Sequence, residues 1–123
     1  MQKTLKVMIV EDEAIIAHSL KLDLKALNVD NIDLVAKGED AVKFAREKKP
    51  SLILMDICLA GAMDGIEAAK KILKYHKIPI VYMTGFATNL IKERAAKTNP
   101  LTFIEKPVDI QIIKNIIKKI QKT

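Results

Sequence analysis

Short apolar segments alternate with amphipathic ones along almost the whole chain, and this alternation restricts the fold more than any other feature. Five segments are short, apolar and bounded by charged residues, Gly or Pro, as buried strands are. They are Leu5–Val10, Asn31–Ala36, Ser51–Met55, Ile80–Met83 and Leu101–Ile104. We predict a helix after each of them, at Glu13–Asn28, Glu39–Lys48, Ile66–Tyr75, Thr88–Lys97 and from an N-cap at Asp109 onward. Alternating strands and helices predict an α/β fold with one parallel sheet covered on both faces.

The length of 123 residues predicts a single domain, residues 1–123, and the 50% of hydrophobic residues is enough for one buried core. The lone Cys58 cannot form an internal disulfide. The apolar stretch before Glu11 is too short for a signal peptide, and no apolar run approaches the roughly 20 residues that span a bilayer. We therefore expect a cytoplasmic protein with no membrane partner.

The formal net charge of +6 admits an acidic partner, either a nucleic acid or an acidic protein face. The lysines are, however, spread along the sequence with no aromatic residues interleaved, as they are on solvated helix surfaces. We therefore expect no direct nucleic-acid partner.

Polar residues follow four of the five predicted strands. Glu11 and Asp12 follow the first, Asp56 the third, Thr84 the fourth and Lys106 the fifth. The carboxyl ends of parallel strands meet at one edge of the sheet, where α/β proteins bind ligands. Each residue alone has a structural explanation: first-turn acids of the next helix, a turn former, an ordinary turn and a solvated lysine. Their joint occurrence at one edge favours a functional site.

The chemistry of this set is that of phosphoryl transfer. Three neighbouring carboxylates repel one another unless a cation lies among them, and oxygen ligands suit Mg²⁺. Cys58, with no nearby His or second Cys, does not make a zinc site. Lys106 and Thr84 offer an ammonium and a hydroxyl to phosphate oxygens. Asp56 is then equipped to attack phosphorus and form an acyl phosphate.

Over essentially its whole length the chain resembles the receiver domain family of two-component response regulators. The resemblance rests on the motifs VMIVEDE, LILMDICL, MDGIEA, PIVYMTG and FIEKP, in this order. It implies a flavodoxin-like fold, a five-stranded parallel sheet of order 2-1-3-4-5 with five helices on both faces. It also implies phosphoryl transfer to Asp56 from a histidine kinase, a phosphotransfer protein or a small donor such as acetyl phosphate.

The resemblance assigns the metal ligands. Mg²⁺ is expected on Asp12, Asp56 and the backbone carbonyl of Cys58, with Glu11 acting through water. Glu11 stands where Asp is common in the family, which keeps the charge. The loop ICLAGAMDG after the phosphoacceptor lacks the proline often found there.

The resemblance also assigns the phosphate contacts and the switch. Thr84 and Lys106 are expected to bind the phosphoryl group, and Thr84 and Phe103 to form the conformational switch. The side chains of Cys58 and Phe86 are expected to tune phosphoryl lifetime, Phe86 by hindering water. A downstream protein is expected on the face of helix four, strand five and helix five, which carries Lys92, Lys97, Lys114 and Lys118. The peptide bond between Lys106 and Pro107 is expected to be cis.

Several alternatives remain open. A degenerate receiver that only docks would share the fold. A phosphatase resembling the haloacid dehalogenase family would place a second Asp where Cys58 stands, and a flavin or nucleotide binder would need a Gly, Ser or Thr cradle after the first strand. We expect no enzyme acting on an outside substrate, only a domain that catalyses its own phosphorylation and dephosphorylation.

Overall fold

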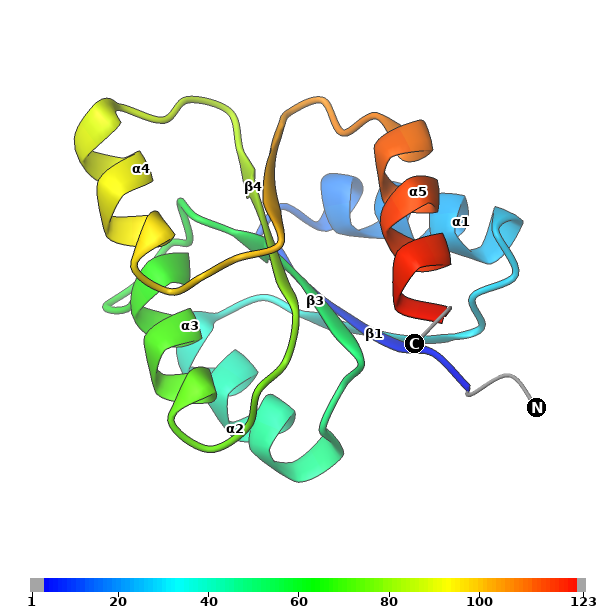
Figure 1. The fold of residues 1–123 in the computed structure, drawn as a ribbon, viewed down its shortest axis with the longest axis horizontal. Coiled ribbons are helices and arrows are strands. Elements are labelled where there is room, and N and C mark those ends of the chain that lie inside the picture. The colour runs from blue at the N-terminus through cyan, green and yellow to red at the C-terminus, as the bar shows by residue number, and fades with distance from the viewer. Residues whose placement is uncertain (1–3, 122–123) are drawn as a thin grey trace.

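The computed structural model describes residues 4–121, which form one five-stranded sheet with five helices around it (Figure 1). The strands are β1 (Lys6–Val10), β2 (Asn31–Val35), β3 (Leu52–Asp56), β4 (Ile80–Thr84) and β5 (Thr102–Glu105). The helices are α1 (Ala14–Ala26), α2 (Gly38–Lys48), α3 (Gly65–Leu73), α4 (Asn89–Ala96) and α5 (Ile110–Gln121). Every predicted strand and helix is present, with ends within two residues of those expected from the sequence.

The sheet has the strand order β2-β1-β3-β4-β5, and all neighbouring strands are parallel. The predicted flavodoxin-like fold is therefore confirmed. The chain leaves β1 toward β2 on one side and later returns to place β3 on the other side. This reversal of strand order lies between β1 and β3, which is where ligands bind in open α/β sheets.

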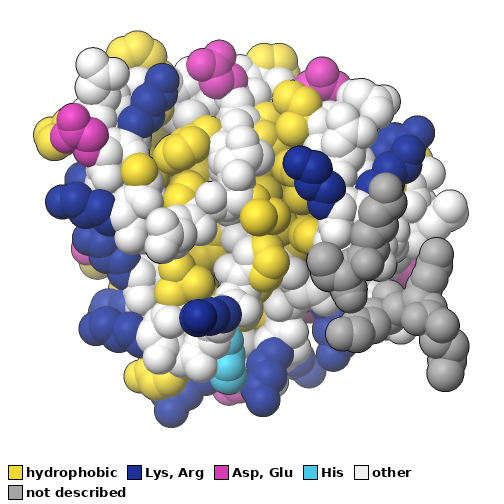
Figure 2. All heavy atoms as spheres, in the orientation of Figure 1, with side chains coloured by type: hydrophobic (Ala, Val, Ile, Leu, Met, Phe, Trp, Pro, Cys, Tyr) yellow, Lys and Arg dark blue, Asp and Glu magenta, His cyan; other side chains and the backbone are white. Residues whose placement is uncertain are grey.

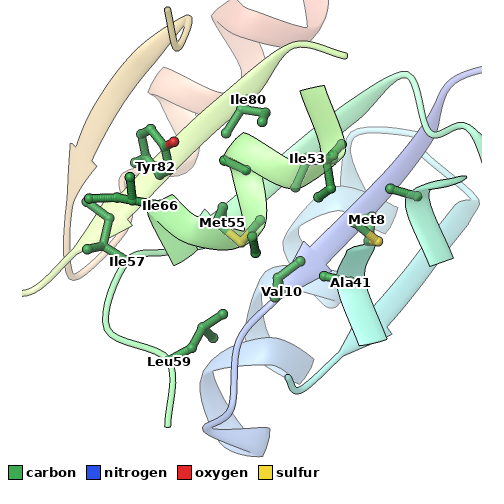
Figure 3. Packing of buried hydrophobic residues seen from close by; sticks show 14 of the residues in the cluster. Met8, Val10, Ala41, Ile53, Met55, Ile57, Leu59, Ile66, Ile80 and Tyr82 are labelled. Carbon is green, nitrogen blue, oxygen red and sulfur yellow. The ribbon is translucent and has the colours of Figure 1, made fainter. Parts of the chain in front are cut away.

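Residues buried on the two faces of the sheet form two hydrophobic clusters, because successive side chains of a strand point to opposite faces. Ile53 and Met55 of β3 point into the cluster under α2, α3 and α4, part of which is seen in Figure 3. Leu52 and Leu54 point into the cluster under α1 and α5. Figure 1 shows the same division, with α1 and α5 on one side of the sheet. None of the helices within residues 4–121 has the length and apolar character needed to cross a membrane.

The start of α1 decides between two interpretations of the acidic pair. The helix begins at Ala14, and its first turn contains no acidic residue. The interpretation of Glu11 and Asp12 as first-turn acids of this helix is therefore wrong. Both residues lie in the connection between β1 and α1, at the carboxyl edge of the sheet.

Candidate functional site

The polar residues of the strand ends meet at one edge because the strand register continues into the loops. The backbone N–H of Ile57 donates to the carbonyl of Met83 at 3.1 Å, one residue beyond the end of β3. The N–H of Lys106 donates to the carbonyl of Thr84 at 2.8 Å, one residue beyond the end of β5. Asp56 is the last residue of β3, which lies between β1 and β4. It is therefore at the carboxyl edge of the sheet, between the ends of these two strands.

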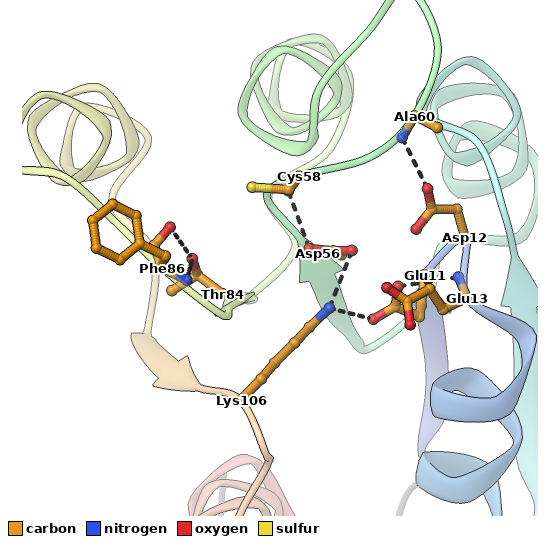
Figure 4. A network of polar contacts seen from close by, with 9 residues as sticks. All are labelled: Glu11, Asp12, Glu13, Asp56, Cys58, Ala60, Thr84, Phe86 and Lys106. Atoms are coloured by element: carbon orange, nitrogen blue, oxygen red, sulfur yellow. Dashed lines mark hydrogen bonds and ion pairs between the residues drawn. The ribbon is translucent and has the colours of Figure 1, made fainter.

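The Asp56 carboxylate is buried, with 3% of the residue exposed, and is held from two sides (Figure 4). Its Oδ1 accepts a hydrogen bond from the backbone N–H of Cys58 at 3.0 Å. Its Oδ2 lies 3.2 Å from Nζ of Lys106. The two contacts fix the orientation of the carboxylate and keep a positive charge beside it.

Glu11 shares the same lysine. Its Oε1 lies 2.7 Å from Nζ of Lys106, and its Oε2 accepts from the N–H of Glu13 at 3.2 Å. Burial raises the pKa of Glu11 to about 7, against the hydrogen bond from Lys106 and with the help of the nearby Asp56 carboxylate. Burial alone would lower the pKa of Lys106, but the hydrogen bond to Glu11 and the charge of Asp56 outweigh burial and raise it.

Asp12 completes a group of three acids with Glu11 and Asp56. One carboxylate oxygen of each lies within 4.8 Å of the others, and Asp12 is exposed while the other two are buried. The Oδ2 of Asp12 accepts from the N–H of Ala60 at 3.0 Å, which holds the β3–α3 loop over the site. An all-oxygen donor set open to solvent on one side fits a hard divalent cation such as Mg²⁺. Lys106 contacts both buried acids, Glu11 and Asp56, so the exposed Asp12 is the acid of the three most open to an ion.

Thr84 is buried at the end of β4, but its hydroxyl does not contact Asp56. The hydroxyl donates to the carbonyl of Phe86 at 2.9 Å and accepts from the N–H of the same residue at 3.2 Å. Figure 4 shows the ring of Phe86 on the far side of Thr84 from Asp56, and the residue is 76% exposed. Shielding of a phosphoryl group by Phe86 therefore stays a prediction that requires the loop after β4 to move. Cys58 is exposed, beside the site.

Phe103, the second expected switch residue, lies half-buried on β5 beside Tyr82 of β4. The two ring centroids are 5.7 Å apart. The hydroxyl of the fully buried Tyr82 lies 2.7 Å from that of Thr98, whose hydroxyl also lies 2.6 Å from the carbonyl of Ala95 in α4. Phe103 thus packs against a residue that is tied to α4. The expected cis peptide bond between Lys106 and Pro107 is present.

Sequence reasoning missed the residues that shape the β3–α3 loop. Gly65 donates its N–H to the carbonyl of Ile57 at 3.0 Å and packs against the backbone of Asp56. Asp64 caps α3 in a reciprocal capping box with Glu67, and its Oδ2 pairs with Arg94 of α4 at 3.1 Å. The spacing of an Asp three residues before a Glu is a recognisable helix start, so this signal was available in the sequence.

A sequence model of the response regulator receiver domain matches residues 7–118. The chain belongs to the response regulator receiver domain family. The transcriptional regulatory protein PdtaR of Mycobacterium tuberculosis is 33% identical over 105 residues, 85% of this chain and 51% of the relative. The phyllosphere-induced regulator PhyR of Methylorubrum extorquens is 32% identical over 103 residues, 83% of this chain and 38% of the relative. This receiver domain thus spans about half the length, or less, of these relatives.

Solved receiver domains share the fold. The signal receiver domain of a modulated diguanylate cyclase from Desulfovibrio desulfuricans has a TM-score of 0.90 at 31% identity, covering 98% of this chain and 95% of that chain. The receiver domain of the sensor histidine kinase PA1611 from Pseudomonas aeruginosa, which has a magnesium ion coordinated in its active-site cleft, has a TM-score of 0.86. It covers 98% of this chain and 100% of that chain at 23% identity. Because the identity is this low, the similarity supports the fold alone.

Proposed function

We propose that this receiver domain accepts a phosphoryl group on Asp56, in the presence of Mg²⁺, from a histidine kinase or a phosphotransfer protein in the cytoplasm. The observation that carries the proposal is the placement of one buried carboxylate between a lysine and two further acids. Lys106 lies 3.2 Å from Asp56, and oxygens of Glu11 and Asp12 lie within 4.8 Å. A carboxylate held in this way is positioned for attack on phosphorus and faces groups that stabilise phosphate charge.

The proposed transfer forms one bond and breaks one. A carboxylate oxygen of Asp56 attacks the phosphorus of a phosphohistidine, the P–N bond breaks, and the imidazole leaves with the electron pair. Lys106 then pairs with a phosphoryl oxygen, and Thr84 donates to another once its hydroxyl leaves the backbone of Phe86. Water later attacks the phosphorus, which releases phosphate and restores the carboxylate. The domain acts on no outside substrate.

The residues that would hold Mg²⁺ are Asp12, Asp56 and the backbone carbonyl of Cys58, with Glu11 contacting the ion through water. When bound, the ion offsets negative charge among the acids and on the phosphoryl oxygens. Lys106 offsets part of the same charge by its 2.7 Å contact with Glu11. Asp12 is exposed whereas Glu11 and Asp56 are buried, so it is the acid most accessible to an ion that enters from solvent.

A groove beside Lys106 offers a docking site for the protein that donates the phosphoryl group. It lies between the first half of α1 and the β5–α5 loop and includes the apolar side chains of Ile15, Ile16, Leu20, Pro107 and Val108. Ile15 is 86% exposed although it is a large apolar residue. A phosphohistidine on a helix seated in this groove would lie next to the site, because Lys106 lines both.

The proposed output is a change of the face made by α4, β5 and α5. Thr84 and Phe103 carry the change. Four exposed lysines lie on the helices of this face or directly after α4: Lys92, Lys97, Lys114 and Lys118. A downstream protein with acidic residues would bind one state of the face more tightly than the other.

Incubation with acetyl phosphate and Mg²⁺ tests the proposal. Intact-mass spectrometry should detect one added phosphoryl group on the wild type and none on Asp56→Asn. Asp30→Asn, the same change at an exposed loop residue, is the matched control and should be labelled normally. An unlabelled wild type would favour a receiver that only docks. Steady turnover of p-nitrophenyl phosphate would favour the phosphatase.

A further inference from the structure

Two short segments of the chain are strongly basic. Residues 43–49 and 70–77 contain eight basic residues and one acidic residue, Glu47. The basic residues are Lys43, Arg46, Lys48, Lys49, Lys70, Lys71, Lys74 and Lys77, and all eight are exposed. The rest of the chain holds 13 basic and 14 acidic residues, a formal net charge of −1. The chain is therefore nearly neutral apart from these two segments.

The fold brings the two segments together at the carboxyl ends of α2 and α3. The guanidinium carbon of Arg46 lies 4.4 Å from the ring centroid of Tyr75, and Nε2 of His76 lies 3.4 Å from the carbonyl of Arg46. Figure 2 shows Lys and Arg side chains gathered over the lower left of the molecule, where Figure 1 places α2 and α3. We call the eight basic residues and Tyr75 the basic face. It lies at the amino edge of the sheet, opposite the Asp56 site.

A groove crosses the basic face between the two helices. Its lining includes four of the basic residues, Lys43, Arg46, Lys71 and Lys74, together with Val42 and Tyr75. Two acids of α2, Glu39 and Glu47, also line it. Four basic residues against two acidic ones leave the groove with an excess of positive charge. Tyr75 is 52% exposed, with its ring beneath a guanidinium.

Helix dipoles account for only part of this charge. Basic residues in the last turn stabilise a helix, and α2 and α3 each have two there, Arg46 and Lys48 in α2 and Lys70 and Lys71 in α3. Four more lysines surround these helix ends. Like charges within a Debye length of about 8 Å repel one another at physiological salt. A polyanion bound across the face would relieve this repulsion.

The composition of the face favours phosphates over a protein partner. Protein interfaces have an apolar core and are depleted in lysine. Among residues 4–121, the exposed large apolar side chains are Ile15, Leu22, Tyr75, Phe86, Leu90, Leu101 and Ile112, and only Tyr75 belongs to the basic face. A groove lined by cations with one exposed aromatic ring is the arrangement that single-stranded nucleic acids bind, through their phosphates and by base stacking.

We propose that the basic face binds single-stranded RNA, the common single strand in a cell, through its phosphates and without sequence specificity. The interpretation of the lysines as solvated surface residues had predicted no nucleic-acid partner. The proposal departs from that expectation because the fold places residues 43–49 beside residues 70–77, with Tyr75 next to Arg46. The proposal does not depend on phosphorylation of Asp56, which lies at the other edge of the sheet.

The test is fluorescence anisotropy of a labelled oligouridylate of about 20 nucleotides titrated with the full chain at several salt concentrations. Nonspecific binding has a Kd of about 1–100 μM at physiological salt, and its logarithm should change linearly with that of salt. Lys71→Glu/Lys74→Glu should weaken binding at least about tenfold and reduce the salt slope by roughly 1.4, since each lost contact with a single strand removes about 0.7. Tyr75→Ala should weaken binding about fivefold or more through lost stacking.

The matched control is Lys25→Glu/Lys119→Glu, which makes the same charge change on exposed residues of α1 and α5. It should leave the affinity within about threefold of the wild type. Equal losses in both double variants would overturn the proposal, because they would reflect net charge alone. Unchanged binding by Lys71→Glu/Lys74→Glu, or equally tight binding of polyglutamate of matched charge, would also overturn it. Circular dichroism of each variant confirms that the fold is retained.

Discussion

Gly65 packs so closely on Asp56 that a Cβ at position 65 would collide with the carbonyl oxygen of Asp56. The same Cβ would lie 2.9 Å from the carbonyl carbon of Asp56 and 3.0 Å from Cα of Ile57. These are backbone atoms of the last residue of β3 and of the residue that follows it, and they cannot move aside separately. The first turn of α3 is thereby fixed against the residue that we propose as phosphoacceptor.

Gly65→Ala should therefore lower the free energy of unfolding by about 1–3 kcal/mol, the usual range for overpacking. It should also slow phosphorylation by acetyl phosphate, because the backbone of Asp56 must shift. Urea denaturation measures the first effect. Gly85→Ala is the control, since nothing lies within 4 Å of a Cβ at that position. Equal stability of the two variants would contradict the packing argument.

Mg²⁺ should raise the melting temperature of the wild type, because an ion that binds only the folded state stabilises it. Asp12→Ala should lose most of this increase, measured by differential scanning fluorimetry over a range of MgCl₂. Glu13→Ala is the control, since this neighbouring acid is the N-cap residue of α1 but makes no capping bond with its side chain. An equal response of Asp12→Ala and the wild type would remove Asp12 from the ion site.

The raised pKa of Glu11 predicts a stability that falls with pH in the absence of divalent ions. In the unfolded chain Glu11 loses its proton near pH 4.5, whereas in the folded chain it keeps the proton to about pH 7. Between these values the folded state binds more protons, so the free energy of unfolding falls as pH rises. Glu11 should account for a loss of about 3 kcal/mol by pH 7 and above.

Denaturation in EDTA from pH 4 to pH 8 checks this, with Glu11→Gln as the comparison. The amide does not titrate, so the difference in stability between the two proteins should change over this interval. A constant difference would mean that Lys106, 2.7 Å away, keeps Glu11 ionised in the folded protein.

The sequence predicted the fold and the edge at which Glu11, Asp12, Asp56, Thr84 and Lys106 lie, because a parallel sheet has one carboxyl edge and strand ends are visible in the sequence. It could not predict which bonds these residues make. The Thr84 hydroxyl has a backbone partner two residues away, and that choice depends on the conformation of the following loop. The contact of Asp12 with Ala60 depends likewise on the β3–α3 loop.

Contacts between segments that are distant in the sequence could also not be predicted from it. Asp64 and Arg94 pair across α3 and α4 at 3.1 Å, although either could have been a solvated surface charge. The basic face arises because two helix ends meet, and the sequence does not show that residues 43–49 and 70–77 lie side by side. Chemistry at strand ends could thus be predicted, whereas contacts between helices could not.

The switch proposed for Thr84 and Phe103 gives the last prediction. In the structure the Thr84 hydroxyl is bound to the backbone of Phe86, and Phe103 is half-buried beside Tyr82. If a phosphoryl oxygen attracts the hydroxyl, we expect the loop after β4 to be released and space to open toward Phe103. Thr84→Ala should therefore keep phosphorylation at Asp56 but lose most of the conformational response of the α4, β5 and α5 face.

Amide NMR shifts with and without beryllofluoride, a phosphoryl mimic, measure that response. Thr84→Ser keeps the hydroxyl and should restore the shifts of the face, whereas Thr84→Ala should leave them near those of the unmodified protein. Thr102→Ala is the control, because its hydroxyl contacts only the carbonyl of Phe103, at 3.4 Å, among the bonds of the described residues. A full wild-type shift pattern around Phe103 in Thr84→Ala would show that the signal reaches β5 without this hydroxyl. The hydrogen bond between the hydroxyls of Tyr82 and Thr98, beside α4, would then be the next contact to remove by mutation.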